Sequence, residues 1–136
     1  MQTQSIPNSL NTREHLQLAT FTLLCFLAFT YNLSEVPPYH ADENFYVTST
    51  RNMIDSGDYI TPTYHGEKRF AKPILFYWLV AASYKIFGVN LFSARLVSTI
   101  FGALCIPLVY IIARRMFDSK TAAISALLLP GCYLHF

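Results

Sequence analysis

Two long runs without a charged side chain constrain the fold of this chain more than any other feature. They extend from Leu16 to Leu33 and from Leu96 to Ala113. A helix needs about 20 mainly apolar residues to cross a bilayer, and about 18 with few charges already make a candidate. Pro107 lies inside the second run, where a membrane helix tolerates it if neighbouring groups satisfy the freed backbone. The sequence therefore predicts two spanning helices.

The composition agrees with a membrane environment. Of the 136 residues, 53% are hydrophobic and only 13% are charged, whereas soluble domains carry about 25% charged residues. A soluble protein of this size could not bury so much apolar surface. The formal net charge of +2 is too small to indicate nucleic acid as a partner. The fold class we expect is mainly α, in a polytopic membrane protein.

A third apolar run, from Thr121 to Phe136, has no polar flank after it. It is barely long enough to span, and two helices with part of another cannot enclose much. We therefore expect a fragment of a longer protein, with a very small membrane subunit as the alternative. A cleaved signal peptide is the competing interpretation of the first run. Against it, Arg13 is offset by Glu14, and no small-residue cleavage site follows the run.

The apolar segment from Pro73 to Phe87 decides the topology. It is short for a span, carries Lys85 near its end, and contains Tyr77 and Trp78, which suit the headgroup level. We expect it to lie along the outer membrane surface, because a span here would invert every later helix. The positive-inside rule then assigns four basic residues to the cytoplasm: Arg13, Arg114, Arg115 and Lys120.

The predicted order is a cytoplasmic N-terminus (1–15), a spanning helix (16–33), a periplasmic loop (34–90), a second spanning helix (96–113), a cytoplasmic loop (114–120) and a truncated third span (121–136). Within the loop we expect amphipathic or interfacial helices at about 43–56 and 73–87. Cys25, Cys105 and Cys132 lie in apolar stretches, and their spacing fits neither a zinc site nor a disulfide framework.

The first of the two loop helices follows from capping and periodicity. Asp42 is a plausible N-cap, and Glu43 would lie in the first turn, where negative charge is favoured. The four residues Tyr46, Thr50, Met53 and Ile54 recur at the spacing of one helical face. Gly57 suits the left-handed residue that ends a helix. We expect a short amphipathic helix near the membrane surface.

Each polar residue of the loop has a structural and a chemical interpretation. Asp42 and Glu43 are either a cap and a dipole-complementing charge, or a pair for base catalysis or metal binding. Lys72 is either a snorkelling lysine or a contact for a lipid phosphate. His40 and His65 are weak candidates for metal ligands, because their spacing matches no ligand pattern.

These pieces occur together in one order. The series is Asp42-Glu43-x-x-Tyr46, Met53-x-x-x-Gly57-Asp58, Pro62, Lys72-Pro73-x-Leu75-x-Tyr77-Trp78, Phe87-Gly88 and Ala94-Arg95-Leu96. It resembles the N-terminal part of the bacterial dolichyl-phosphate-mannose protein mannosyltransferase-like family, and in pattern the aminoarabinose transferases that modify lipid A. The resemblance covers about residues 16–136.

The resemblance implies a GT-C fold with interfacial helices in a large first periplasmic loop, in a multi-pass protein of the cell inner (plasma) membrane. It implies sugar transfer from a polyprenyl-phosphate-linked donor to a lipid, glycan or protein acceptor. Asp42 would be the general base, and Glu43 would assist at the acceptor or at a divalent metal cation. Lys72 would steady the donor phosphate, and Tyr46 and Arg95 would belong to the substrate site, Arg95 more in a structural or headgroup role.

The sequence departs from the pattern of the aminoarabinose transferases at two positions, and two other classes of function compete with the glycosyltransferase. Ala71 and Ile74 stand where the aminoarabinose transferases tend to have Glu and a second Pro, which favours a relative with another sugar. A non-catalytic membrane subunit is one alternative function. A transporter fragment is the other, although transporter acids usually lie within a helix near mid-membrane. As a fragment, the chain by itself is expected to be inactive.

Overall fold

The computed structural model describes residues 11–31, 33–35 and 41–133, apart from the side chains of Ala41, Asp42 and Tyr133. Over these residues the chain is mainly helical, as expected, with five helices and one two-stranded sheet. It divides into two compact units. Unit 1 comprises 1–31 with 99–136, and unit 2 comprises 32–98.

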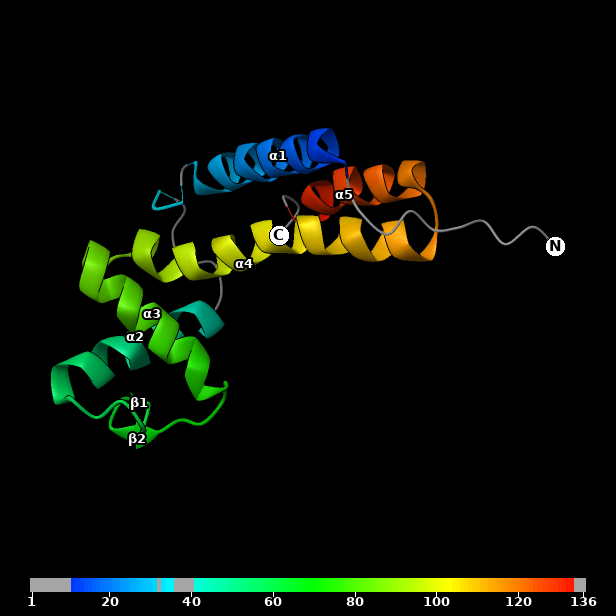
Figure 1. The fold of residues 1–136 in the computed structure, drawn as a ribbon. Coiled ribbons are helices and arrows are strands. Elements are labelled where there is room, and N and C mark those ends of the chain that lie inside the picture. The colour runs from blue at the N-terminus through cyan, green and yellow to red at the C-terminus, as the bar shows by residue number, and fades with distance from the viewer. Residues whose placement is uncertain (1–10, 32, 36–40, 134–136) are drawn as a thin grey trace. The chain divides into compact units, whose positions relative to one another are not determined.

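Unit 1 contains α1 (Thr12–Thr30), most of α4 (Leu91–Met116) and α5 (Ser119–Tyr133), and Figure 1 shows these helices side by side. Four alanines line the contact, and small residues let membrane helices approach closely. Glu14 of α1 accepts hydrogen bonds from Arg114 Nη2 at 3.4 Å and Ser119 Oγ at 3.3 Å, which joins one end of each helix. The buried cluster is Cys25, Phe29, Ala103, Ile106, Tyr110, Ala113, Ala122 and Ala126.

The helix α4 is the one element of the described residues that is long and apolar enough to cross a membrane. It starts at Leu91, because Asn90 caps it by accepting a hydrogen bond from the Ser93 backbone N–H at 2.8 Å. Arg95 therefore lies inside this helix and not before it. Pro107 is also inside the helix, as the sequence suggested. The helix α1 begins in polar residues and ends at Thr30.

Unit 2 is built on α2 (Ala41–Ser56) and α3 (Ile74–Phe87). The predicted face of α2 is buried, with Thr50 and Met53 fully enclosed and Tyr46 only 8% exposed. Its hydrophobic members share one cluster with Tyr77, Val80 and Tyr84 of α3. The predicted apolar face of α2 thus packs against protein side chains of α3.

The ends of α2 partly match expectation. The helix starts at Ala41, so Asp42 lies in the first turn and not at the N-cap, while Glu43 stays in the first turn. A one-residue difference in a helix start is common, because the terminal turn is held by few hydrogen bonds. Gly57 follows the last residue with φ +74°, which confirms the predicted left-handed ending.

A short hairpin follows α2. Strand β1 (Thr63–Tyr64) pairs antiparallel with β2 (Glu67–Lys68). The two residues between them, His65 and Gly66, have φ values of +50° and +84°, as a tight two-residue hairpin turn of type I′ requires. Asn52 of α2 donates a hydrogen bond to the Thr63 carbonyl at 3.0 Å and holds the hairpin against the helix.

Candidate functional site

The candidate site in unit 2 centres on an ion pair between the first turn of α2 and the start of α4. Arg95 Nε donates to Glu43 Oε1 at 2.5 Å, and Arg95 Nη2 donates to Glu43 Oε2 at 2.9 Å. Arg95 Nη1 also donates to the Leu33 carbonyl at 2.7 Å. Each side chain of the pair is only 15% exposed. Such two-point pairing fixes the orientation of both groups as well as their charge.

Two buried tyrosines lie beside this ion pair. Burial, and then the negative charge of Glu43, raise the pKa of Tyr46 well above its usual range. The same two causes, in the same order, raise the pKa of Tyr84 to about 12. The Tyr84 hydroxyl is buried and finds no hydrogen-bond partner among the described residues. Both tyrosines are therefore neutral hydroxyl groups at physiological pH.

Lys72 joins this group through aromatic rings. Its Nζ lies 5.0 Å from the ring centroid of Tyr46 and 5.5 Å from that of Phe76. The two rings pack edge to face at 5.1 Å. Since Tyr46 is one turn after Glu43 on α2, the structure brings Glu43, Tyr46, Lys72 and Arg95 into one connected group.

The remaining candidate residues are placed as follows. The backbone of Asp42 directly precedes Glu43 in the first turn of α2, and its side chain is outside the described atoms. His40 also lies outside the described residues. His65 is exposed at the hairpin turn, where its ring packs against Tyr64 at 4.2 Å between centroids.

A metal fits the described residues poorly. In the part of the chain that the structure describes, no three His, Cys, Asp or Glu side chains come together as a metal site would require. Both carboxylate oxygens of Glu43 already accept hydrogen bonds from Arg95. The described residues thus give no support for a metal ion at Glu43.

Sequence reasoning missed two members of this region. Tyr84 was not among the candidate residues of the sequence. It lies in the apolar segment of α3, eleven positions before Arg95. The guanidinium of Arg69 lies 3.7 Å from the ring centroid of Phe45, next to Tyr46 on α2. Cation–π pairing between distant residues has no sequence signal, so only the fold reveals it.

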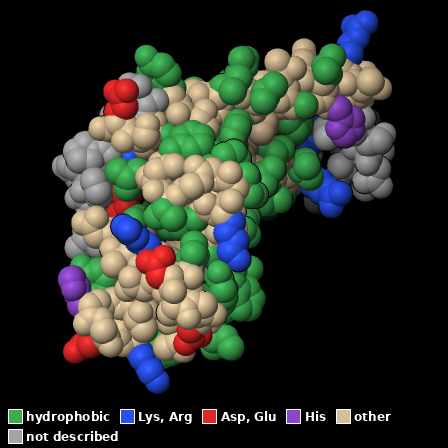
Figure 2. Space-filling view, turned by 90° about the vertical axis from the view of Figure 1, so that its left-hand side faces the viewer, with side chains coloured by type: hydrophobic (Ala, Val, Ile, Leu, Met, Phe, Trp, Pro, Cys, Tyr) green, Lys and Arg blue, Asp and Glu red, His purple; other side chains and the backbone are tan. Residues whose placement is uncertain are grey.

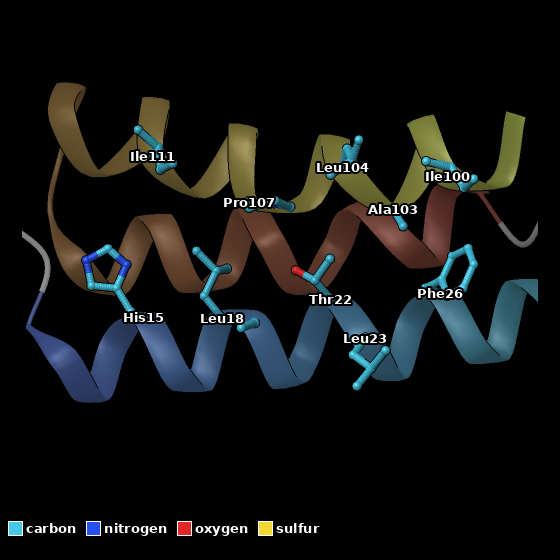
Figure 3. A pocket seen from close by; sticks show the side chains of 11 residues that line it. His15, Leu18, Thr22, Leu23, Phe26, Ile100, Ala103, Leu104, Pro107 and Ile111 are labelled. Atoms are coloured by element: carbon cyan, nitrogen blue, oxygen red, sulfur yellow. The ribbon is translucent and has the colours of Figure 1, made fainter. Parts of the chain in front are cut away.

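A separate cavity opens in unit 1 between α1 and α4, with a volume of about 590 Å³. Figure 3 shows Leu18, Thr22 and Phe26 of α1 facing Ile100, Leu104 and Pro107 of α4 across it. His15 lies at one end and is its one titratable lining residue. No carboxylate lines this apolar cavity, so it is not a candidate for acid–base chemistry.

The surface of unit 2 is different from this apolar cavity, since Figure 2 shows acidic, basic and hydrophobic side chains interspersed there.

Comparisons with known proteins agree with the resemblance. Residues 71–136 match the family model of dolichyl-phosphate-mannose-protein mannosyltransferase. An uncharacterized protein of Aquifex aeolicus is 39% identical over 103 residues, which cover 76% of this chain and 21% of that protein. No solved structure gives a significant match.

Two further relatives carry informative names. An undecaprenyl phosphate-alpha-4-amino-4-deoxy-L-arabinose arabinosyl transferase 2 of Pseudomonas fluorescens is 36% identical, over 84% of this chain and 19% of its own. A transferase of the same kind from Pseudomonas aeruginosa is 34% identical, over 82% of this chain and 21% of its own. The chain thus spans about a fifth of the length of these relatives. The matched region begins just before Lys72 and takes in α3, α4 and α5, so over residues 71–136 the chain is related to the dolichyl-phosphate-mannose-protein mannosyltransferase family.

Proposed function

We propose that this chain contributes to a glycosyltransferase of the GT-C fold, which transfers a sugar from a polyprenyl-phosphate-linked donor to a lipid, glycan or protein acceptor. The observation that carries the proposal is the connected group of Glu43, Tyr46, Lys72 and Arg95, with Asp42 directly before it on α2. These positions come from three parts of the family pattern that are far apart in the sequence: the segment with Asp42, Glu43 and Tyr46, then Lys72, then Arg95. Their convergence supports a common site.

The reaction needs two groups that these residues can supply. Asp42 takes the proton of the acceptor hydroxyl as that oxygen attacks the anomeric carbon of the donor sugar. The bond between that carbon and the phosphate oxygen breaks, and the polyprenyl phosphate leaves with the electron pair. The ammonium of Lys72 lies near this leaving phosphate and stabilises its charge. No nucleotide is required, in line with the lack of a Gly-rich phosphate loop in the sequence.

Glu43 has a positioning role in this scheme. Its carboxylate is engaged by Arg95 through two hydrogen bonds, so it is a poor base and a poor cation ligand in this state. The pair instead fixes the first turn of α2 against α4, and this turn carries Asp42. Arg95 acts in the same way, since it also holds the Leu33 carbonyl before α2.

The family is membrane-embedded, and α4 is a candidate span. We propose that the protein is a multi-pass protein of the cell inner (plasma) membrane, that 34–90 form a periplasmic loop, and that α2 and α3 lie at the membrane surface. The ion pair between Glu14 and Arg114 supports a common cytoplasmic end for α1 and α4, because Arg13 and Arg115 are the adjacent residues.

The test is a transfer assay in membranes of cells that express the full-length gene, because the 136-residue chain by itself is expected to be inactive. The donor is a radiolabelled sugar on undecaprenyl phosphate, with 4-amino-4-deoxy-L-arabinose and a hexose compared because Ala71 and Ile74 depart from the aminoarabinose pattern. Asp42→Asn should lower the transfer rate by a factor on the order of 10² to 10⁴, the usual contribution of a positioned base. Lys72→Gln should lower it as well, because the leaving phosphate loses its cation.

Two matched controls are available on the same unit. Asp55→Asn removes an exposed acid of the same helix, and Lys68→Gln removes an exposed lysine of the hairpin. Both should transfer sugar at the original rate, with equal amounts of protein in the membrane fraction. Normal transfer by Asp42→Asn would overturn the assignment of the base, and equal loss in the controls would make the effect nonspecific.

A further inference from the structure

A hollow on the outer side of α3 has no role in the proposed transfer. It has a volume of about 320 Å³ and is lined by Tyr59, Trp78, Ala81, Ala82 and Lys85. Trp78 and Lys85 are seven residues apart on α3, which is about two helical turns, and the short side chains of Ala81 and Ala82 lie between them in the sequence. Tyr59 contributes to the lining from the segment after α2.

The polar groups of the hollow are held in place. The Trp78 indole N–H donates a hydrogen bond to the Tyr59 carbonyl at 2.7 Å. The Lys85 ammonium lies 4.7 Å from the centroid of the Tyr59 ring. The hollow therefore combines one cation with two aromatic side chains, each with an apolar body and a polar edge.

The hollow lies at the edge of an exposed apolar stripe. Leu75, Ala82 and Ile86 recur at helical spacing on α3, and Leu75 and Ile86 are 59% and 73% exposed. The opposite face of the helix, with Tyr77, Val80 and Tyr84, is the one buried against α2. This stripe fits the acyl region of a lipid monolayer, and the hollow beside it fits the headgroup level, where Trp and Tyr concentrate in membrane proteins.

The hollow is distinct from the proposed donor site. Lys72 precedes the first residue of α3, whereas Lys85 is near its last turn. With a rise of about 1.5 Å per residue, the eleven steps from Ile74 to Lys85 span about 16 Å. One phosphate cannot contact both ammonium groups.

We propose that this hollow binds the headgroup of an anionic glycerophospholipid. The Lys85 ammonium pairs with the lipid phosphate, and the rings of Tyr59 and Trp78 pack against the glycerol and the first methylenes. Charge complementarity selects an anionic lipid over a zwitterionic one, because the net charge of the headgroup meets a cation at the membrane surface. The bound lipid fixes α3 at the headgroup level, whether or not sugar is transferred.

The experiment uses Trp78, which is the single tryptophan of the chain. The detergent-solubilised protein is titrated with short-chain phosphatidylglycerol, short-chain phosphatidylcholine or inorganic phosphate, and the Trp78 emission is recorded. Phosphatidylglycerol should give a saturable change with a midpoint about fivefold lower than phosphatidylcholine, as expected for one lysine near a lipid surface. Inorganic phosphate should give no change over the same range.

The variants assign the preference to Lys85. Lys85→Gln should bring the two lipid midpoints together, Lys85→Arg should keep the preference, and Lys68→Gln should behave like the original protein. Lys85→Arg also serves as a control for misfolding, because a variant that still prefers phosphatidylglycerol over phosphatidylcholine has an intact hollow. Equal midpoints for both lipids in the original protein, or an unchanged preference in Lys85→Gln, would overturn the proposal. A change with inorganic phosphate alone at the same midpoint would also overturn it, in favour of a free phosphate.

Discussion

The ion pair between Glu43 and Arg95 allows a quantitative test of how unit 2 is held together. We consider Glu43→Gln, Arg95→Met and the double variant. Each single change leaves the other charge in a site where only 15% of the side chain is exposed. Removing one partner of a buried pair costs about 3 kcal/mol of unfolding free energy, at the lower end of the range because the pair is not fully buried.

The double variant should cost less than the sum of the two single changes. The sum is about 6 kcal/mol, but the double variant removes both charges together. We expect a loss of about 4 kcal/mol, part of which is the hydrogen bond from Arg95 to the Leu33 carbonyl. The difference of about 2 kcal/mol is the interaction energy of the pair.

The assay is urea unfolding of the 136-residue chain in detergent micelles, followed by Trp78 emission. Arg51 and Asp55 provide the control cycle, because they form an ion pair at 3.8 Å on the same helix with side chains 66% and 68% exposed. This surface pair should give an interaction energy of about 0.4 kcal/mol. If the Glu43 and Arg95 changes add to within about 0.5 kcal/mol, the two residues are not coupled and the positioning role of the pair is wrong.

Two further predictions concern single residues. Burial raises the pKa of Tyr84 in the folded state to about 12 from its ordinary value of 10.0. The protonated Tyr84 hydroxyl therefore makes its full contribution to the free energy of unfolding below pH 10, and this contribution is lost as the pH rises through the pKa of the folded state. Ultraviolet titration should therefore show tyrosines that ionise only at a pH above the ordinary pKa. The Tyr84→Phe variant should have fewer of them. A titration curve of Tyr84→Phe identical to that of the unsubstituted protein would contradict the assignment. Gly66→Ala should lower the free energy of unfolding by about 1 kcal/mol, since φ is +84° but no atom lies within 4 Å of the added Cβ. Gly131→Ala, inside α5 with equally open space, is the control and should not destabilise the chain, because alanine is the better helix former.

The helices of unit 2 could be predicted because their signals are local. The spacing of Tyr46, Thr50 and Met53 marked the face that is buried, and Gly57 marked the end of the helix. The environment of that face was not predictable in the same way. Periodicity shows which side chains avoid water, but protein and lipid satisfy it equally well.

The contacts of the candidate site needed the fold. Arg95 and Glu43 are 52 positions apart in the sequence. Arg95 was expected just before a spanning helix and Glu43 in the periplasmic loop, and no local sequence pattern indicates that two such residues pair. The two-residue strands of the hairpin were also missed, because so short a strand has no period-two pattern. The start of α4 at Leu91 depends on the Asn90 cap, which the apolar run alone does not include.

The two units also differ in their natural spectroscopic groups. The one tryptophan is in unit 2, and the three thiols, Cys25, Cys105 and Cys132, are all in unit 1. Cys25 is buried between helices, so its reaction with a thiol reagent reports the opening of unit 1. A single sample thus carries an intrinsic fluorophore in unit 2 and a buried thiol in unit 1. If fluorescence loss and thiol reactivity follow one transition, the units unfold as one cooperative body; if they separate, each unit has its own stability.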